Sequence, residues 1–163
     1  MATDAVDRII AQWNKERPEL DASPMGFLGR TTRLASHIRK SLDRTFKAFG
    51  IVAGEFDVLA TLRRSGKPYQ LTPTALFKSM MVSSGTMTNR IDKLETAGLV
   101  KRLPDPSDRR GMLIQLTQKG IDLIDAAVEA HVANGERMLD ALDSSEREAL
   151  ASLLRKLLIS FEE

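Results

Sequence analysis

Side chains that can bind DNA gather in one segment of the chain, residues 83–97. Met87, Ile91 and Leu94 recur there at helical spacing, which predicts a helix with an apolar stripe facing the protein interior. The opposite face carries small, hydroxyl, amide and basic groups, the types that read base edges in a major groove or bind phosphates. A plain solvated helix face would show the same pattern. The candidate DNA contacts are Ser83, Ser84, Gly85, Thr86, Thr88, Asn89, Arg90 and Lys93.

A second candidate group lies in "PDPSDRRG", between the short apolar runs "LVKRL" and "MLIQL". The two runs predict strands, and the segment between them predicts a hairpin loop. We expect the Asp108 carboxylate to hold the Arg110 guanidinium in one orientation, because arginine–carboxylate pairing is geometrically specific. Arg109 and Arg110 at such a tip would suit a narrow minor groove. The alternative is a solvated turn with a surface ion pair.

The elements that position these groups are mainly helical. Thr72 is well placed as a helix N-cap before Pro73, and it is a further candidate DNA contact. Gly98 is well placed to end the next helix in the left-handed conformation. Apolar spacing and caps predict helices in Val6–Trp13, Leu34–Phe49, residues 53–66, residues 72–81, residues 82–98, a long segment after Thr117, and residues 143–163.

This order of five helices, two strands and two helices is typical of a winged helix-turn-helix lobe enclosed by terminal helices. The predicted fold class is therefore mainly α. The last helix has a broad apolar face, with Leu150, Leu154, Leu157 and Phe161 among its members. Helices at opposite chain ends with unused apolar faces predict an intertwined homodimer.

Charge is unevenly distributed along the chain. Residues 62–119 contain 11 Lys and Arg against 4 Asp and Glu, a net charge of about +7 by counting. Residues 120–163 contain 4 against 10, about −6 by counting. A basic middle segment favours a surface that faces a polyanion, although chance clustering on a solvated face would look similar.

Several functional classes are not expected. The chain of 163 residues has no cysteine, which excludes disulfides and thiolate metal sites. His37 and His131 lie far apart in sequence, so we expect no metal site and no cofactor. We find no nucleophile–base set or phosphate-binding glycine loop, and we expect no enzyme. Without an apolar signal core or a membrane-spanning run, a cytoplasmic protein with no membrane partner is expected.

The segments "EFDVLATL", "LTPTALFKSMMVSSGTMTNRIDKLETAGLVKR" and "DPSDRRGMLIQLTQKG" resemble the MarR family of transcriptional regulators. The resemblance implies a homodimeric winged-helix repressor that binds double-stranded DNA and responds to a small molecule. It implies a single domain, 1–163, with dimerisation helices in residues 1–49 and 118–163 and a DNA-binding lobe in residues 52–117. Its recognition helix would span Ser83–Ala97, and its wing Lys101–Leu116 with Asp108 and Arg110 as the functional pair.

A helix before the family core, together with "SGTMTNRIDKLE" and "PDPSDRRG", resembles the urate-responsive and PecS-like branch of that family. This implies an anionic aromatic ligand such as urate, bound by Trp13, Asp57 and Arg90, with Arg102 as a fourth contact. The alternatives are core packing for Trp13 and a structural ion pair between Asp57 and Arg90. At the level of the whole protein, the alternatives are a regulator that answers phenolic or antibiotic-like compounds and a dimeric interaction protein without DNA affinity.

Overall fold

The computed structural model describes residues 2–80 and 87–162. The chain divides into two compact units, Met1–Leu42 and Asp43–Glu163, and the boundary between them falls inside the second helix. Helices make up most of both units, and a small antiparallel sheet lies in the second, which confirms the mainly α class. Within the described part of the chain, no helix is long and apolar enough to cross a membrane.

The first unit consists of α1 (Ala5–Glu16) and most of α2 (Pro24–Lys47). The Asp4 carboxylate caps α1 by accepting the N–H groups of Val6 and Asp7, and the Asp7 carboxylate accepts the N–H of Asp4 at 2.8 Å. Two such reciprocal bonds satisfy N–H groups that a helix start leaves without partners. Val6 packs closely against Gly29 of α2, where an added Cβ would lie 3.1 Å from a Val6 methyl group.

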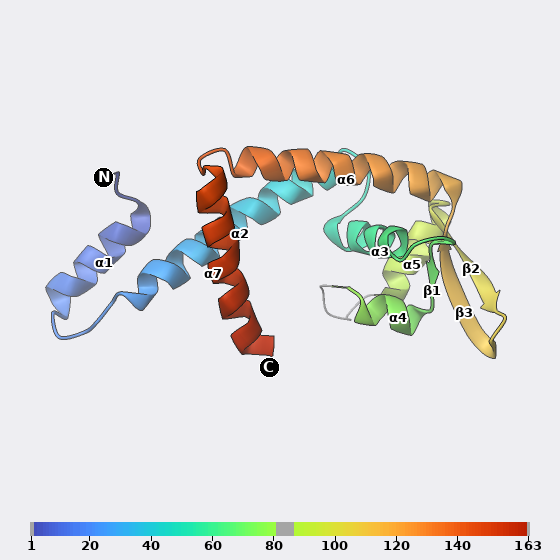
Figure 1. Ribbon diagram of the computed structural model, residues 1–163, viewed down its shortest axis with the longest axis horizontal. Coiled ribbons are helices and arrows are strands. Elements are labelled where there is room, and N and C mark those ends of the chain that lie inside the picture. The colour runs from blue at the N-terminus through green and yellow to red at the C-terminus, as the bar shows by residue number, and fades with distance from the viewer. Residues whose placement is uncertain (1, 81–86, 163) are drawn as a thin grey trace. The chain divides into compact units, whose positions relative to one another are not determined.

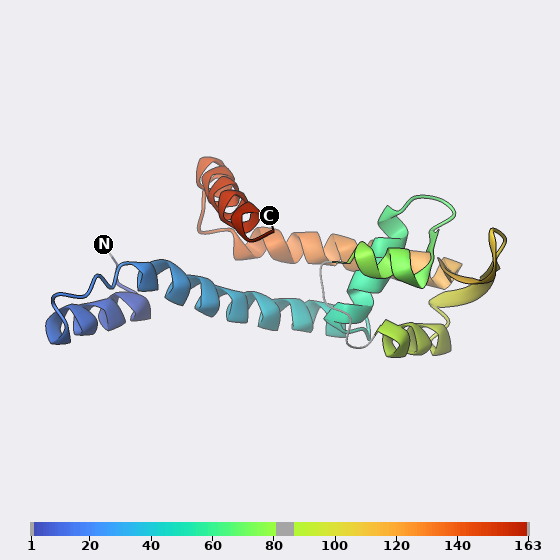
Figure 2. The same cartoon turned by 90° about the horizontal axis from the view of Figure 1, so that it is seen from below.

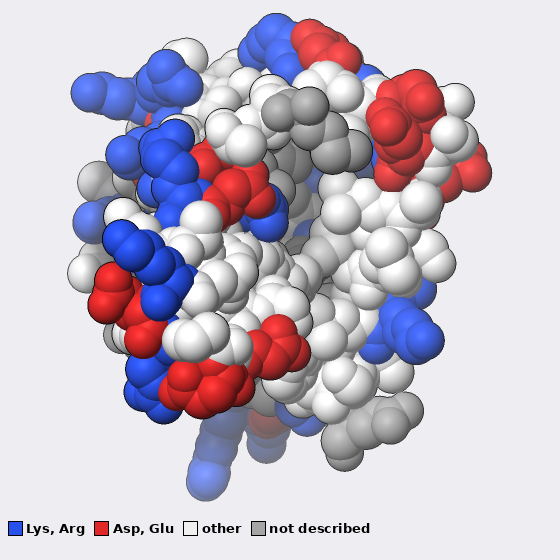
Figure 3. Space-filling view, turned by 90° about the vertical axis from the view of Figure 1, so that its left-hand side faces the viewer, with Lys and Arg blue, Asp and Glu red and all other residues white. Residues whose placement is uncertain are grey.

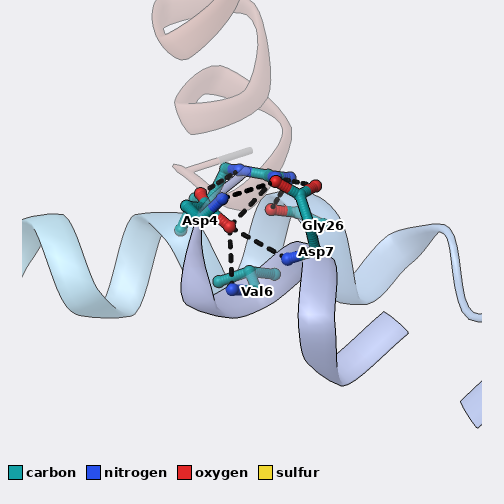
Figure 4. Close-up of polar contacts among 5 residues, drawn as sticks. Asp4, Val6, Asp7 and Gly26 are labelled. Atoms are coloured by element: carbon teal, nitrogen blue, oxygen red, sulfur yellow. Dashed lines mark hydrogen bonds and ion pairs between the residues drawn. The ribbon is translucent and has the colours of Figure 1, made fainter. Parts of the chain in front are cut away.

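Arg30 of α2 ties down the start of α1 (Figure 4). Its Nε donates a hydrogen bond to Asp4 at 2.8 Å, one Nη donates to Asp7, and the other donates to the Gly26 carbonyl at 3.3 Å. The N–H of Asp7 and the Arg30 guanidinium both hold the pKa of the Asp4 carboxyl below its ordinary value. Asp4 therefore serves as a helix cap and as one side of an interhelical tie.

The second unit contains all the strands. These form an antiparallel sheet in the order β1-β3-β2. Helix α3 packs on α6 (Figure 1), and Figure 2 shows the hairpin of β2 and β3 extending beyond the helices of this unit. Its elements are α3 (Ala53–Arg64), β1 (Gln70–Leu71), α4 (Pro73–Lys78), α5 (Met87–Thr96), β2 (Val100–Asp105), β3 (Asp108–Leu116), α6 (Gln118–Met138) and α7 (Ser144–Glu162).

One core joins α3, α4, α5, the sheet and α6. Phe46, near the end of α2, stacks on Phe56 of α3 with ring centroids 4.2 Å apart. Arg63 of α3 donates two hydrogen bonds, of 2.7 and 3.1 Å, to the Asp125 carboxylate of α6 and so ties these helices together. The largest side chains that are fully buried are Leu59, Leu62, Leu76, Leu94, Ile114, Ile124, Val58 and Val100.

The structure corrects the expected strands in two respects. The sequence pattern missed β1, which pairs with β3 through Gln70 and Leu71. The expected loop "PDPSDRRG" is instead mostly strand, since the pairing of β2 and β3 continues to Asp105 and Asp108 and leaves only residues 106–107 as the turn. This outer part of the hairpin is largely exposed on both faces, so its side chains lack the alternation that would have indicated strands.

Candidate nucleic-acid interface

Helix α5 has two chemically distinct faces. Ile91 and Leu94 are buried and Met87 is half-buried, which confirms the predicted inward stripe. Thr88, Asn89, Lys93 and Thr96 are exposed on the other side. The predicted contacts Ser83, Ser84, Gly85 and Thr86 lie outside the described residues.

Helix α4 precedes α5 and has a side-chain N-cap. The Thr72 hydroxyl accepts the N–H of Ala75 at 3.1 Å, and Pro73 takes the first helical position, so the predicted N-cap is confirmed. The cap leaves Thr72 at the helix start, where backbone N–H groups suit an approaching phosphate. A DNA contact by Thr72 stays a prediction.

The wing is the β2–β3 hairpin, and the expected ion pair at its tip is absent among the described residues. The Asp108 carboxylate instead accepts the backbone N–H of Arg110 at 2.9 Å. Carboxylates commonly bond to a backbone N–H two residues ahead in turns, and this local bond prevailed over the expected side-chain pair. Arg109 and Arg110 are exposed, and as successive strand residues they point to opposite faces of the hairpin.

Two residues that we had not singled out shape this tip. The Asp105 carboxylate accepts the hydroxyl of Ser107 at 2.6 Å and its N–H at 2.8 Å, and these bonds hold the pKa of Asp105 below its ordinary value. Gly111 is the close-approach point, because a Cβ there would lie 2.9 Å from the Asp105 Cβ and 3.0 Å from the Asp108 Cβ. The "DRRG" pattern could have indicated this role for the glycine.

Arg102 joins the wing to α5. Its guanidinium donates hydrogen bonds to the carboxylates of Asp92 and Glu95, and its N–H donates to Glu95 at 3.1 Å. The hydrogen bond to Asp92, and then the charge and bonding of Glu95, raise the pKa of Arg102. The predicted effector contact at Arg102 stays a prediction, but the structure already gives this side chain two carboxylate partners. The i, i+3 spacing of the two acids on α5 was the available sequence signal.

Arg90 reaches inward from α5 to α3, as its place at the edge of the apolar stripe predicted. Its Cζ and Nε atoms lie 2.6 Å from the position that a Cβ on Gly54 would take. Burial raises the pKa of the half-buried Asp57 on α3, and Arg90 is the largest opposing charge, followed by Arg64 and His131. A hollow of about 260 Å³ lies beside Arg90, lined by Val52, Gly54, Glu55, Asn89, Arg90 and Lys93.

Trp13 belongs to the first unit, whereas Asp57, Arg90 and Arg102 belong to the second. Trp13 is 41% exposed in the single chain, whereas Val6 is the buried residue of α1. Within residues 2–80 and 87–162, no group of three or more potential metal ligands occurs.

Helices α4 and α5 followed by an antiparallel hairpin form a winged-helix DNA-binding lobe, and the exposed polar face of α5 lies where such lobes read a major groove. The sequence model of the MarR family matches residues 51–112. The chain belongs to the MarR family, since it is 42% identical over 149 residues to the HTH-type transcriptional regulator PecS of Dickeya dadantii, a match that covers 91% of this chain and 90% of that protein.

Two further comparisons agree. The Multiple antibiotic resistance protein MarR of Escherichia coli is 30% identical over 136 residues, which cover 80% of this chain and 90% of that protein. A crystal structure of a mutant MarR from E. coli complexed with operator DNA matches 90% of this chain and 97% of that chain, with a TM-score of 0.70 and 28% identity. The protein is therefore a DNA-binding transcriptional regulator of the PecS-like type and not an enzyme.

Proposed function

We propose that this protein is a homodimeric, cytoplasmic repressor that occupies a pseudopalindromic operator and is released from it by a small anionic aromatic effector, with urate as the candidate. The observation that carries the proposal is the position of Arg90. This residue lies on the helix that faces DNA, yet its guanidinium packs on α3 within the electrostatic reach of Asp57.

The DNA contacts in this proposal come from two elements. Thr88, Asn89 and Lys93 on α5, with the residues just before them, would meet base edges and phosphates in a major groove. Arg110 and Arg109 on the wing would reach the neighbouring minor groove. In this assignment residues 52–117 form the DNA-binding lobe, and residues 1–49 and 118–163 supply the dimerisation helices.

The homodimer accounts for apolar surface that the single chain leaves exposed. No described residue of α7 is buried, although the helix carries Leu153, Leu157 and Phe161. Figure 3 shows uncharged side chains between groups of charged ones. A second copy would remove such surface from water and would place two α5 helices on one operator.

The effector would act through Arg90. A planar anion can bind a guanidinium and stack on an indole, which are the groups of Arg90 and Trp13. A ligand that binds the guanidinium where it packs on α3 would hold Arg90 there, change the position of α5 and lower DNA affinity. Such a coupling is reciprocal, so operator DNA must weaken effector binding by the same factor.

The proposal is tested by the emission of Trp13, the only tryptophan in the chain. Urate added without DNA should quench this emission in the wild-type protein and in Lys93→Ala, and should not do so in Arg90→Ala. Urate should also release an operator duplex that the wild-type protein has selected from random sequence. If urate at millimolar concentration changes neither Trp13 emission nor operator binding, the effector assignment is wrong and only the DNA-binding regulator remains.

A further inference from the structure

Gly54 is a glycine that the backbone does not require. It lies in α3, and its φ is outside the left-handed region in which glycine is favoured. Gly54 is the second residue of α3, and ordering a glycine costs more conformational entropy than ordering an alanine. An explanation for glycine at this position must therefore come from its surroundings.

Those surroundings are the end of one side chain. The three atoms nearest to the position of a Cβ on Gly54 all belong to Arg90: Cζ and Nε at 2.6 Å and Nη2 at 3.0 Å. Real Cβ atoms do not approach other atoms within 3.0 Å, so any side chain at residue 54 displaces this guanidinium. Because the displaced group is the end of a flexible side chain, the rest of the fold can stay in place.

We propose that Gly54 is a positioning residue that leaves room for the Arg90 guanidinium against α3 and thereby keeps Arg90 away from the DNA-facing surface of α5. Asp57 lies three residues further along α3 and supplies a negative charge to the same guanidinium. Gly54 and Asp57 together form the position that Arg90 occupies on α3, which we call its seat. Gly54 contributes by having no side chain to fill the space, and Asp57 contributes its negative charge. Filling the seat at residue 54 should release Arg90 toward DNA.

The first test compares Gly54→Ala with Gly135→Ala. Gly135 is a helical glycine of α6 at which a Cβ would meet no atom within 4 Å, so it serves as a matched control. Binding is measured by fluorescence anisotropy over a range of salt, with a duplex that the wild-type protein has selected from random sequence. Gly54→Ala should bind about threefold more tightly, with a salt slope steeper by about one unit, because one more cation reaches the phosphates. Gly135→Ala should match the wild-type protein.

Arg90→Ala provides the decisive comparison. Without the guanidinium, a Cβ at residue 54 no longer meets the three atoms that lie nearest to it, so adding Gly54→Ala to Arg90→Ala should leave operator affinity unchanged. If Gly54→Ala changes affinity by the same factor in both backgrounds, it acts on α3 itself and the inference is wrong. The inference is also wrong if Gly54→Ala has no effect in the wild-type background.

A second readout needs neither DNA nor effector. The carboxyl carbon signal of Asp57 in NMR reports its titration, and Gly54→Ala should raise the pKa of Asp57 further by moving Arg90 away. Arg90→Met should raise it in the same way with Gly54 left in place, which keeps the test valid even if Gly54→Ala folds poorly. If the pKa of Asp57 is unchanged in both variants, the proposed placement of Arg90 beside Gly54 and Asp57 is wrong.

The effector arm of the test rests on the proposed function. If urate quenches Trp13 in the wild-type protein and does so less in Gly54→Ala, Arg90 must sit on α3 for the effector to act. If urate has no effect on the wild-type protein, the effector assignment fails alone, and the DNA and Asp57 measurements still decide the role of Gly54.

Discussion

Arg30, Arg63 and Arg102 each contact at least one carboxylate, whereas Arg109 and Arg110 are exposed on the wing. The first three join secondary-structure elements to one another. Exposed arginines on a projecting hairpin keep their donors available for an outside acceptor such as phosphate. The arginines with carboxylate partners therefore help to hold the fold together, and the exposed arginines of the wing are the ones that can bind DNA.

Removal of Arg110 should weaken DNA binding measurably. Arg110→Ala should lower operator affinity about tenfold and reduce the salt slope by about one unit, because one phosphate or minor-groove contact is lost. Lys15→Ala, which removes an exposed cation from α1, is the control and should change neither quantity. Fluorescence anisotropy at several salt concentrations gives both numbers. Equal affinity and slope in Arg110→Ala and the wild-type protein would contradict the assignment of the wing.

Asp108 has a different expected effect now that its carboxylate is known to bond the backbone N–H of Arg110. Asp108→Ala removes a constraint on the hairpin backbone, so its effect on operator affinity should be smaller than that of Arg110→Ala. A larger effect would mean that the carboxylate contacts the guanidinium in the DNA complex.

Asp57 should make stability depend on pH. Burial raises its pKa in the folded protein above the ordinary value of 3.8. Between these two pKa values the folded state binds more protons than the unfolded state, so the free energy of unfolding falls as pH rises through this range. Asp57→Asn removes this fall. Urea unfolding at a series of pH values should show the variant gaining stability relative to wild type as pH rises from below 3.8, and parallel curves would rule this out.

At the scale of elements, α1 is held at its start by polar groups. Asp4 and Asp7 cap the helix and also accept hydrogen bonds from Arg30 of α2 (Figure 4). Val6 is the one buried residue of α1. A short helix with little buried surface depends on caps and side-chain ties to stay formed.

Arg30→Ala should therefore loosen α1. Amide hydrogen exchange across Ala5–Glu16 should become several-fold faster, because both carboxylates lose their interhelical partner, while exchange in α6 stays as in wild type. Arg39→Ala, an exposed arginine elsewhere on α2, is the matched control. In the wild-type protein, a smaller loosening should occur as pH falls through the lowered pKa of Asp4, since protonation removes the ion pair of Asp4 with Arg30 but not the separate bond from Arg30 to Asp7. Unchanged exchange in Arg30→Ala would show that α1 does not need this tie.

At the scale of the whole molecule, α7 has more exposed large apolar side chains than any other described helix, and the folding of a single chain does not explain them. Leu153 is 66% exposed and Phe161 is 79% exposed. A large contiguous group of exposed apolar side chains marks an interaction surface. A homodimer is the arrangement that suits an operator with two half-sites.

The dimer predicts two measurements. Sedimentation at micromolar concentration should show a dimer, and Leu154→Glu should shift it toward monomer by placing a charge in the apolar face. Lys156→Glu, on the same helix, is the control for added negative charge. A footprint on the selected operator should cover two half-sites about one helical turn apart, since each α5 needs its own major groove on one side of the duplex. A folded wild-type monomer at micromolar concentration would exclude this assembly.

Local features were accessible from the amino-acid sequence by itself. The stripe of Met87, Ile91 and Leu94, the cap formed by Thr72 and the left-handed Gly98, with φ of 71°, are all as predicted. Each depends on residues within about four positions of one another, because helix periodicity and capping are local properties of the chain. With the two predicted strands, they indicated the winged-helix class and the helix that is proposed to face DNA.

Only the tertiary structure decided which distant groups meet. Strand β1 has two residues and exists because β3 lies beside it, so no pattern within Gln70–Leu71 could indicate it. The close fit of Arg90 on Gly54 joins residues from different helices, and the burial of Asp57 follows from the same packing. Such contacts depend on how the core of α3, α5 and α6 closes. The spacing of residues along the sequence does not predict these contacts, because a side chain meets a partner on another element only after both elements have packed.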